Sequence, residues 1–362
     1  MMVVEPIKTL PEFERIRDAY ERAYERDPHH TVFVSWAWLR SYFASMAPEW
    51  LVLAVRREGE YIAFATLVSR EARVGPIVLH REAALGAYPT SDYTSLVIAE
   101  EKEACIDALA GAIAALEWDV LRARNVRDPR VAPLVERLAA HGHVLAEPPT
   151  PCRYVPLPSS WDAYAALARR HCTRRPCTVV RARRAWTEAQ FTDANDATID
   201  GSIEILLQLH HRRWQSNLGE ARRTYGRLFR EAYDRGCCRI SVLKRGDAPV
   251  AAQAIFANGE PRIRNLYMIA ADRSQSRAPG LGILARDIER AIAEGVVEYD
   301  FLRGDETYKA HFGAELRQLE NATLRRRGVK ARVGDRLWEF AVRAKGPVRR
   351  FLLRMHLLRE RA

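Results

Sequence analysis

The alternation of apolar and polar positions predicts a mixed α/β chain in which one order of elements occurs twice. The first half is expected to contain helices at 11–25 and 36–45, strands at 50–57, 60–70, 74–79 and 93–98, a helix at 101–117, a strand at 118–126 and a helix at 129–141. The second half is expected to contain helices at 202–216 and 225–235, strands at 237–244, 249–257 and 261–271, a helix at 277–294, a strand at 296–304, a short helix and a strand at 318–327. Residue identity between the halves is faint, so we expect an architectural repeat, with the proline-rich segment 146–160 between the two units.

The helix expected at 277–294 begins with unusually small residues. Its apolar positions recur at intervals of three and four: Leu281, Leu284, Ala285, Ile288, Ala291 and Ile292. The helix opens with R-x-x-G-x-G, formed by Arg277-Ala278-Pro279-Gly280-Leu281-Gly282. Unpaired amides at a helix N-terminus attract anions, and glycines allow a bulky anion to approach them. The spacing differs from the dinucleotide fingerprint G-x-G-x-x-G, so we expect a diphosphate other than that of NAD. The alternative is a tight turn that opens an ordinary surface helix.

The chain is basic, with a formal net charge of +11 from 57 Lys and Arg against 46 Asp and Glu. Basic residues are concentrated at 169–184, at 325–332 and in the last twenty residues. This excess favours an anionic partner, although a solvated arginine-rich surface also explains much of it. Pro176 and the β-branched run after Cys177 argue against one continuous helix across 169–184.

The cysteines and the two ends of the chain restrict the class of protein. Six cysteines are present, none in a C-x-x-C pair, so a structural zinc is not expected: Cys105, Cys152, Cys172, Cys177, Cys237 and Cys238. The N-terminus lacks the pattern of a signal peptide, and no apolar run of eighteen residues occurs, so we expect a cytosolic protein. Residues 348–361 form a basic amphipathic pattern, typical either of an interfacial membrane helix or of a terminal helix packed on the protein.

Two motifs resemble those of a known superfamily. R-x-x-G-x-G at 277–282 resembles the pyrophosphate-binding motif of the GNAT acyltransferases. The string D-F-L-R-G-x-E-x-Y-K at 300–309 resembles the CelD-like acetyltransferases, which are associated with cellulose or exopolysaccharide synthesis and are related to the Fem-type peptidoglycan aminoacyltransferases. The resemblance implies two tandem GNAT-like units, each a mixed, mostly antiparallel sheet flanked by helices. The expected boundaries are 1–150 for a unit that shapes the acceptor site, 151–330 for a unit that binds acyl-CoA, and 331–362 for a helical tail.

The same resemblance implies where the coenzyme binds. Backbone amides from Ala278 through Gly282, after Arg277, would hold the coenzyme A diphosphate. The pantetheine arm would run beside the strand that carries Met268, Ile269 and Ala270, and the strand after the coenzyme helix would splay away from it. Tyr308, on the following short helix, would lie near the thioester sulfur.

Acyl transfer requires an unprotonated nucleophile, stabilisation of an oxyanion and a proton for the departing thiolate. Tyr308 is the candidate proton donor, because a phenol with a pKa near 10 stays protonated at neutral pH; the alternative is a tyrosine that packs on the core. Asp300, within an apolar strand, is the candidate base or organiser of the site, or else a structural partner of Arg303 or of a backbone amide. Asp305 is a second catalytic candidate, or the N-cap of the short helix.

Five further residues are candidates for binding the acceptor. Arg303 lies at the end of the splayed strand, and Glu306 and Lys309 follow it. Lys309 is supported by the resemblance to the Fem-type enzymes, although a surface lysine is the alternative. In the first half, Asp92 and Tyr93 match a family motif and would line the cleft between the units.

These residues predict an acyl-CoA-dependent N-acyltransferase that uses acetyl-CoA or another acyl-CoA and no metal. The acceptor would be an amine, or a sugar hydroxyl, of a small molecule or of a cell-envelope polysaccharide precursor. A Fem-type aminoacyltransferase using aminoacyl-tRNA is the first alternative. A non-catalytic nucleic-acid-binding protein is the second, disfavoured because the basic run lacks interleaved aromatic residues.

Overall fold

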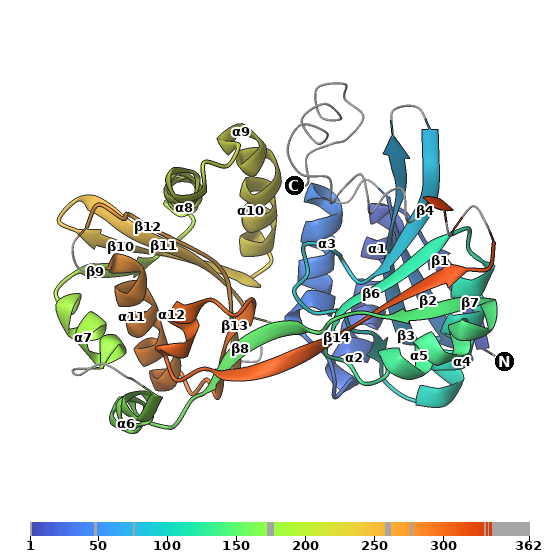
Figure 1. Ribbon diagram of the computed structural model, residues 1–362, viewed down its shortest axis with the longest axis horizontal. Helices are drawn as coiled ribbons and strands as arrows, with labels where there is room; N and C mark the ends of the chain where they lie inside the picture. The colour runs from blue at the N-terminus through green and yellow to red at the C-terminus, as the bar shows by residue number, and fades with distance from the viewer. Residues whose placement is uncertain are drawn as a thin grey trace. The chain divides into compact units, whose positions relative to one another are not determined.

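The computed structural model describes residues 2–46, 49–74, 77–171, 177–257, 262–275 and 278–328, together with 331, 333 and 334. The chain forms two compact units. The first combines Met1–Leu39, Ala47–Pro149 and the chain from Leu319 on, and the second combines Arg40–Met46 with Thr150–Gln318. Each unit contains strands and flanking helices (Figure 1), so the mixed α/β class expected from the sequence is confirmed.

The first unit is built on a mixed sheet with the order β1-β2-β3-β4-β6-β14, in which β5 pairs with β3 and β7 pairs with β14. Its strands are β1 (Met2–Ile7), β2 (Trp50–Arg57), β3 (Glu60–Val74), β4 (Ile77–Leu85), β5 (Val97–Ile98), β6 (Val120–Val126), β7 (Gly142–Ala146) and β14 (Glu315–Arg326). The described pairs are antiparallel except β4 with β6.

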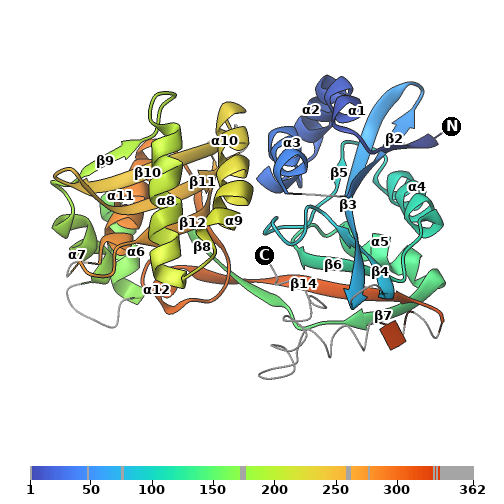
Figure 2. The same cartoon turned by 90° about the horizontal axis from the view of Figure 1, so that it is seen from above.

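Helices cover both faces of this first sheet. The helices of the N-terminal part are α1 (Leu10–Arg15), α2 (Arg17–Arg26), α3 (Trp36–Ser45), α4 (Lys102–Ala115) and α5 (Val131–Leu138). Ala63 and Ala65 of β3 belong to a hydrophobic cluster with α4 and α5. Phe64, between them, contacts Tyr20 of α2, with ring centroids 4.5 Å apart. Because side chains alternate along a strand, α2 and α4 lie on opposite faces (Figure 2).

The second unit has a sheet with the order β8-β13-β12-β11-β10-β9. Its strands are β8 (Thr150–Pro156), β9 (Gln190–Asp193), β10 (Cys238–Arg245), β11 (Ala248–Phe256), β12 (Ile263–Ala271) and β13 (Glu298–Arg303). The described pairs are antiparallel except β12 with β13.

Helices also cover both faces of the second sheet. They are α6 (Trp161–His171), α7 (Thr178–Ala185), α8 (Ile199–Trp214), α9 (Leu218–Ala221), α10 (Arg227–Asp234), α11 (Pro279–Ala293) and α12 (Thr307–Ala310). Ile255 of β11 clusters with α11, whereas its neighbour Phe256 meets Phe229 of α10, with ring centroids 6.3 Å apart. This alternation places α10 and α11 on opposite faces of β11 (Figure 1).

The two units repeat the same special backbone positions. The helix α4 begins after Glu101 (φ 48°) and α11 begins after Ala278 (φ 44°), and both residues are left-handed. Strand β6 contains Asn125 (φ 56°) and β13 contains Leu302 (φ 58°). Each unit also has one parallel strand pair, β4 with β6 in the first and β12 with β13 in the second, and each pairing spans three residue pairs. Residues other than glycine seldom adopt such φ values, so these matches support the architectural repeat expected from the sequence.

Several boundaries agree with the sequence prediction, and one connection differs from it. Strand β2 has the predicted bounds, and α3 begins after Ser35, whose Oγ accepts a hydrogen bond from the amide of Trp38 at 3.2 Å. The strand expected at 318–327 to close the second unit is part of β14, which lies next to β8 in the strand order but also pairs with β6 and β7, and its Leu324 is buried in the core of the first unit. Short-range periodicity identified this strand, but only long-range pairing assigns it to a sheet.

Two further expectations concern helices. A single helix across 169–184 is absent among the described residues, since α6 ends at His171 and α7 begins at Thr178. Within the same described part of the chain, no helix is long and apolar enough to cross a membrane. The expected tail at 331–362 lies outside the described residues, apart from 331, 333 and 334.

Candidate acyl-donor site

Strands β12 and β13 separate after a short parallel contact. Their pairing ends at Asn265 with Asp300, and no later pair occurs between them in the described ranges. Strand β12 continues to Ala271 with β11 as its partner on the other edge. An antiparallel partner uses alternate backbone groups, so the remaining amides and carbonyls between Leu266 and Ala271 can bond to a ligand. The splayed pair implied by the resemblance is therefore present.

A network around one turn makes β13 depart from β12. Leu302 adopts φ 58°, and its amide donates a hydrogen bond to Oδ1 of Asp300 at 2.8 Å. Gly304 follows with φ 100°. The Nζ of Lys309 donates to the carbonyls of Arg303 at 2.6 Å and Gly304 at 3.2 Å. A buried carboxylate and a buried ammonium thus hold the turn that leads from β13 into α12.

The start of α11 offers fewer donors than the motif implied. Ala278 is the N-cap and Pro279, the first residue of the helix, has no amide hydrogen. The amides of Leu281 and Gly282 both donate to the carbonyl of Ala278, at 3.0 Å and 3.3 Å. The amide of Gly280 makes no hydrogen bond within the described residues and can therefore bond to a diphosphate. Arg277 of the motif lies outside the described residues.

The two glycines of the motif serve different purposes. A Cβ on Gly280 would lie 3.3 Å from the Cβ of Ala271, at the wall of a pocket. A Cβ on Gly282 would lie 2.3 Å from Cδ1 of Trp186. Gly282, predicted as a coenzyme contact, is therefore required by the packing of α11 against Trp186 and faces away from the pocket.

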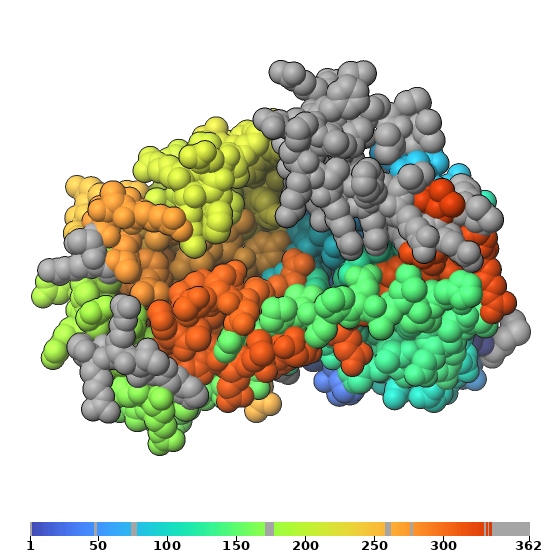
Figure 3. Space-filling model, in the orientation of Figure 1, coloured from blue at the N-terminus to red at the C-terminus, as the bar shows by residue number. Residues whose placement is uncertain are grey.

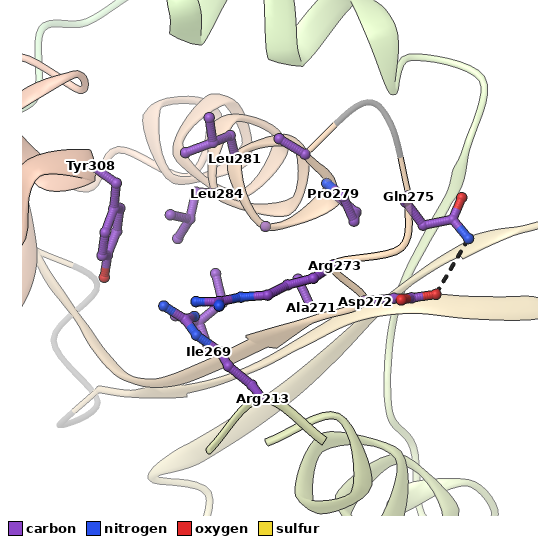
Figure 4. Close-up of a pocket in the computed structure, with 12 residues that line it drawn as sticks. Arg213, Ile269, Ala271, Asp272, Arg273, Gln275, Pro279, Leu281, Leu284 and Tyr308 are labelled. Carbon is purple, nitrogen blue, oxygen red and sulfur yellow. Dashed lines mark hydrogen bonds between the residues drawn. The ribbon is translucent and has the colours of Figure 1, made fainter. Parts of the chain in front are cut away.

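A pocket of about 360 Å³ lies between the start of α11, the end of β12 and α12 (Figure 4). Its lining residues are Arg213, Ile269, Ala271, Asp272, Arg273, Gln275, Ala278, Pro279, Gly280, Leu281, Leu284 and Tyr308. Ile269 and Ala271 contribute to the wall, whereas the predicted contacts Met268 and Ala270 alternate with them along β12 and do not line it.

Tyr308 lines the pocket, as the sequence prediction requires. Its ring meets Phe301 in a T-shaped arrangement with centroids 6.4 Å apart. Burial, assisted by the charge of Glu306, raises the pKa of Tyr308 above its usual value, against a smaller opposing effect of Arg213. The phenol therefore keeps its proton at neutral pH and can donate it within the pocket.

Two arginines of the pocket were not predicted. Arg213 comes from the last turn of α8, and Arg273 comes from the connection between β12 and α11. Arg213 stands in the run His210-His211-Arg212-Arg213, where no sequence signal separates a pocket residue from its neighbours. Only the packing of α8 against β12 brings it to the site.

The predicted catalytic carboxylates lie outside the pocket. Asp300 is fully buried, contacts the Sγ of Cys152 at 3.5 Å and forms an ion pair with Arg317 at 3.5 Å, besides its bond to Leu302. Its geometry fits the organising role and not that of a general base. Asp305 pairs with Arg153 at 2.7 Å. It is not the N-cap of α12, because Glu306 occupies that position.

The predicted acceptor contacts of this region are engaged with the protein. The side chain of Lys309 is 3% exposed and pairs with Glu306 at 2.8 Å while it holds the carbonyls of the turn. Its ammonium is held by these groups and Lys309 does not line the pocket, so its substrate-binding role stays a prediction. Arg303 is half-buried at the end of β13 and does not line the pocket.

In the first unit, Tyr93 is a core residue. Its ring is buried against Phe33, with centroids 5.8 Å apart, and the Arg127 guanidinium lies 5.3 Å from the ring centre. The neighbouring Asp92 is 8% exposed. Packing within the unit thus explains Tyr93 without a substrate. At the helix start that matches Ala278, this unit has Glu101, which forms an ion pair with Arg57.

Cysteine and metal chemistry are not indicated at this site. In the part of the chain that the structure describes, no cluster of three His, Cys, Asp or Glu residues could hold a metal ion. The cysteines there are free and buried, and burial raises the pKa of Cys237 to about 12. The thiol of Cys237 therefore stays protonated and unreactive at neutral pH.

The sequence of the region that contains the pocket and the splayed strands matches a known domain family. Residues 169–310 match the family model for the acetyltransferase (GNAT) domain. The second unit therefore contains a GNAT-type acetyltransferase domain. A search of curated protein sequences finds no significant match.

Solved structures share the fold over both units. FemX has a TM-score of 0.62 at 11% identity, covering 93% of this chain and 99% of FemX. The C-terminal domain of a putative lysylphosphatidylglycerol synthetase from Agrobacterium fabrum has a TM-score of 0.57 at 10% identity, covering 92% and 97%. L-PGS from Bacillus licheniformis has a TM-score of 0.53 at 9% identity, covering 90% and 97%. At these identities the likeness establishes the fold alone.

Proposed function

We propose that the protein is an acyl-CoA-dependent N-acyltransferase. The observation that carries this proposal is the pocket of about 360 Å³ in which Gly280, the splayed end of β12 and Tyr308 meet. A long, flexible donor with an anionic head fits this arrangement, because a helix N-terminus, a strand edge and a phenol follow one another along it. The match of residues 169–310 to the acetyltransferase domain supports the same donor class.

Each part of the pocket has a role in this proposal. The bound coenzyme supplies an activated thioester. The amide of Gly280, at the positive end of α11, holds the diphosphate. Unpaired backbone groups between Leu266 and Ala271 bond to the amides of the pantetheine arm and polarise the thioester carbonyl. Tyr308 Oη holds a proton for the departing sulfur.

Nitrogen is the better acceptor in this site. The carboxylate that lines the pocket, Asp272, accepts hydrogen bonds from the amide and Oγ of Ser274 at 2.9 Å and 2.8 Å. Asp300 is buried elsewhere, so neither carboxylate is proposed as a general base. A neutral amine attacks a thioester without one, whereas a sugar hydroxyl needs its proton removed. We therefore propose an amine of a small molecule or polysaccharide precursor, in keeping with the CelD-like motif at 300–309.

Calorimetric titration with acetyl-CoA tests the donor. Gly280→Glu places a bulky anion at the pocket wall and is expected to weaken binding by about 100-fold or more. Gly201→Glu is the matched control, because a side chain at Gly201 meets no atom within 4 Å. Equal binding by wild type and Gly280→Glu, with both folded, would overturn the proposed donor site.

An aminoacyltransferase is the second candidate. It is favoured by the likeness of the fold to FemX and to a putative lysylphosphatidylglycerol synthetase, and by the net charge of +11, which suits a charged RNA. Salt-sensitive binding of aminoacyl-tRNA, with no binding of acetyl-CoA, would favour this candidate over the first.

A further inference from the structure

Two cationic side chains enter the pocket without a carboxylate partner. Within the described residues, neither Arg213 nor Arg273 forms an ion pair, and the guanidinium of Arg213 lies 4.8 Å from the ring centre of Trp214. Arg213 is half-buried, and its Nε is inaccessible to solvent and has no hydrogen-bond partner. Leaving a buried donor unpaired is costly, and an anionic group of a ligand would give this nitrogen a partner.

The nearest carboxylate of the pocket is already occupied. Asp272 bonds to Ser274, and its second oxygen accepts from Nε2 of Gln275 at 3.3 Å. Figure 4 shows Asp272 directed toward Gln275, whereas Arg213 and Arg273 extend into the pocket beside Ile269. The protein therefore supplies two positive charges to the interior and holds its own negative charge at the margin.

The two guanidinium groups lie on the Tyr308 side of the pocket in Figure 4, and Pro279 lies on the other side. The charge of Arg213 also acts on Tyr308, which requires the two side chains to be near each other. The walls around them are apolar, from Ile269 and Leu284. A group bound here would be a charged group at the reacting end of the ligand. It would be separate from the diphosphate that we propose to bind at Gly280.

We infer that Arg213 and Arg273 form a second anion-binding subsite, which takes a carboxylate or phosphate of the group being transferred or of the acceptor. Planar guanidinium groups bind such anions through paired hydrogen bonds. This inference rests on the proposed function for the identity of the reacting end. It adds a substrate class: an acyl donor with a terminal carboxylate, or an amine that carries an anionic group.

Calorimetry with matched ligand pairs distinguishes these sources. Succinyl-CoA and butyryl-CoA have the same chain length and differ by the terminal carboxylate, which tests the donor. Phosphoethanolamine and ethanolamine, titrated into the protein saturated with CoA, test the acceptor. We expect the anionic member of one pair to bind about tenfold more tightly than its neutral partner.

Arg213→Gln is expected to abolish that difference, and Arg213→Lys to restore part of it. Arg181→Gln, an exposed change of the same charge on α7, is expected to leave it intact. Wild-type discrimination below about twofold in both pairs would overturn the inference. If Arg213→Gln weakened the binding of all CoA ligands by the same factor, the inference would also be overturned. Arg213 would then bind the diphosphate that all of these ligands share.

Failure of the proposed function has a different signature. If no CoA ligand binds the wild type, the donor assignment is wrong, and the subsite is judged by thermal shift with inorganic phosphate and succinate alone. Stabilisation by either anion that disappears in Arg213→Gln and persists in Arg181→Gln supports the subsite. Equal shifts in all three proteins overturn it.

Discussion

The carboxylate of Asp300 accepts a hydrogen bond at 2.8 Å from the amide of Leu302, two residues further along the same strand. This bond stabilises a left-handed residue, with φ 58°, within β13. A leucine in this conformation is strained, and the strain is located where β13 leaves β12. The splay that opens the pocket thus depends on a side chain that does not enter it.

Replacing Asp300 should therefore destabilise the second unit. In Asp300→Ala, the Leu302 amide and the Arg317 guanidinium lose a buried partner. We expect the free energy of unfolding in urea to fall by about 2–4 kcal/mol. Asp300→Asn keeps an acceptor for the amide and should lose less. Asp247→Ala, an exposed turn residue, is the control, and an Asp300→Ala protein as stable as this control would contradict the assignment.

Lys309 should affect turnover through the position of Tyr308. Its ammonium binds the carbonyls of Arg303 and Gly304 next to α12. Lys309→Met leaves these carbonyls without their donor, so the turn loosens. We expect kcat to fall by about tenfold or more with KM for the donor nearly unchanged. A change in KM alone would instead indicate direct contact with the substrate.

Tyr308→Phe tests the proton donor. The ring can keep its contact with Phe301, so stability should be unchanged while kcat falls by about 100-fold. The raised pKa of Tyr308 keeps the phenol protonated, and the wild-type rate should show no loss due to this group up to a pH of about 10. Steady-state rates against pH measure both effects. Turnover of Tyr308→Phe equal to that of wild type would remove this role.

The two glycines of the motif should respond differently to alanine. Gly282→Ala puts a methyl group 2.3 Å from Trp186 and should lower the stability by about 1–3 kcal/mol. Gly280→Ala meets Ala271 at 3.3 Å and should cost less stability while it narrows the pocket. Thermal unfolding and donor titration of both variants separate the effects. The reverse order of stabilities would contradict the packing described for Trp186.

The first unit should lose stability in acid through Glu82. Burial raises the pKa of Glu82, but the neighbouring imidazole of His80 and the charges of Arg70 and Arg122 outweigh it and lower the pKa to about 2. A carboxyl whose folded pKa is depressed stabilises the fold above its unfolded pKa, near 4.5, and loses this contribution as pH falls toward 2. We expect a loss of roughly 3 kcal/mol across this range, absent in Glu82→Gln. Urea unfolding at several pH values measures it.

Local signals predicted the elements, and long-range packing decided what they do. The helix after Ser35 and the strand at 50–57 follow from a cap and from alternation, which the chain carries within a few residues. The position of Tyr308 could be predicted because this residue follows the splayed strand closely in the sequence. Arg213 was missed, because its place depends on α8 crossing a sheet whose strands lie far along the chain.

The direction of charged side chains was the least predictable property. Lys309 and Asp300 both stand in the motif, yet both bond to the turn between them. A sequence shows that a charge is present near a site but not whether the backbone nearby needs it. Leu302 and Gly304 have left-handed φ values, and the backbone around them uses both Asp300 and Lys309 as hydrogen-bond partners.

The last described strand has a consequence for biosynthesis. Strand β14 supplies Leu324 to the core of the first unit and lies there between β6 and β7. The ribosome synthesises this strand after the second unit, so the sheet of the first unit keeps an open edge until the second unit has been made. An expression clone that stops near residue 150 would produce a polypeptide with that edge permanently uncovered, prone to self-association.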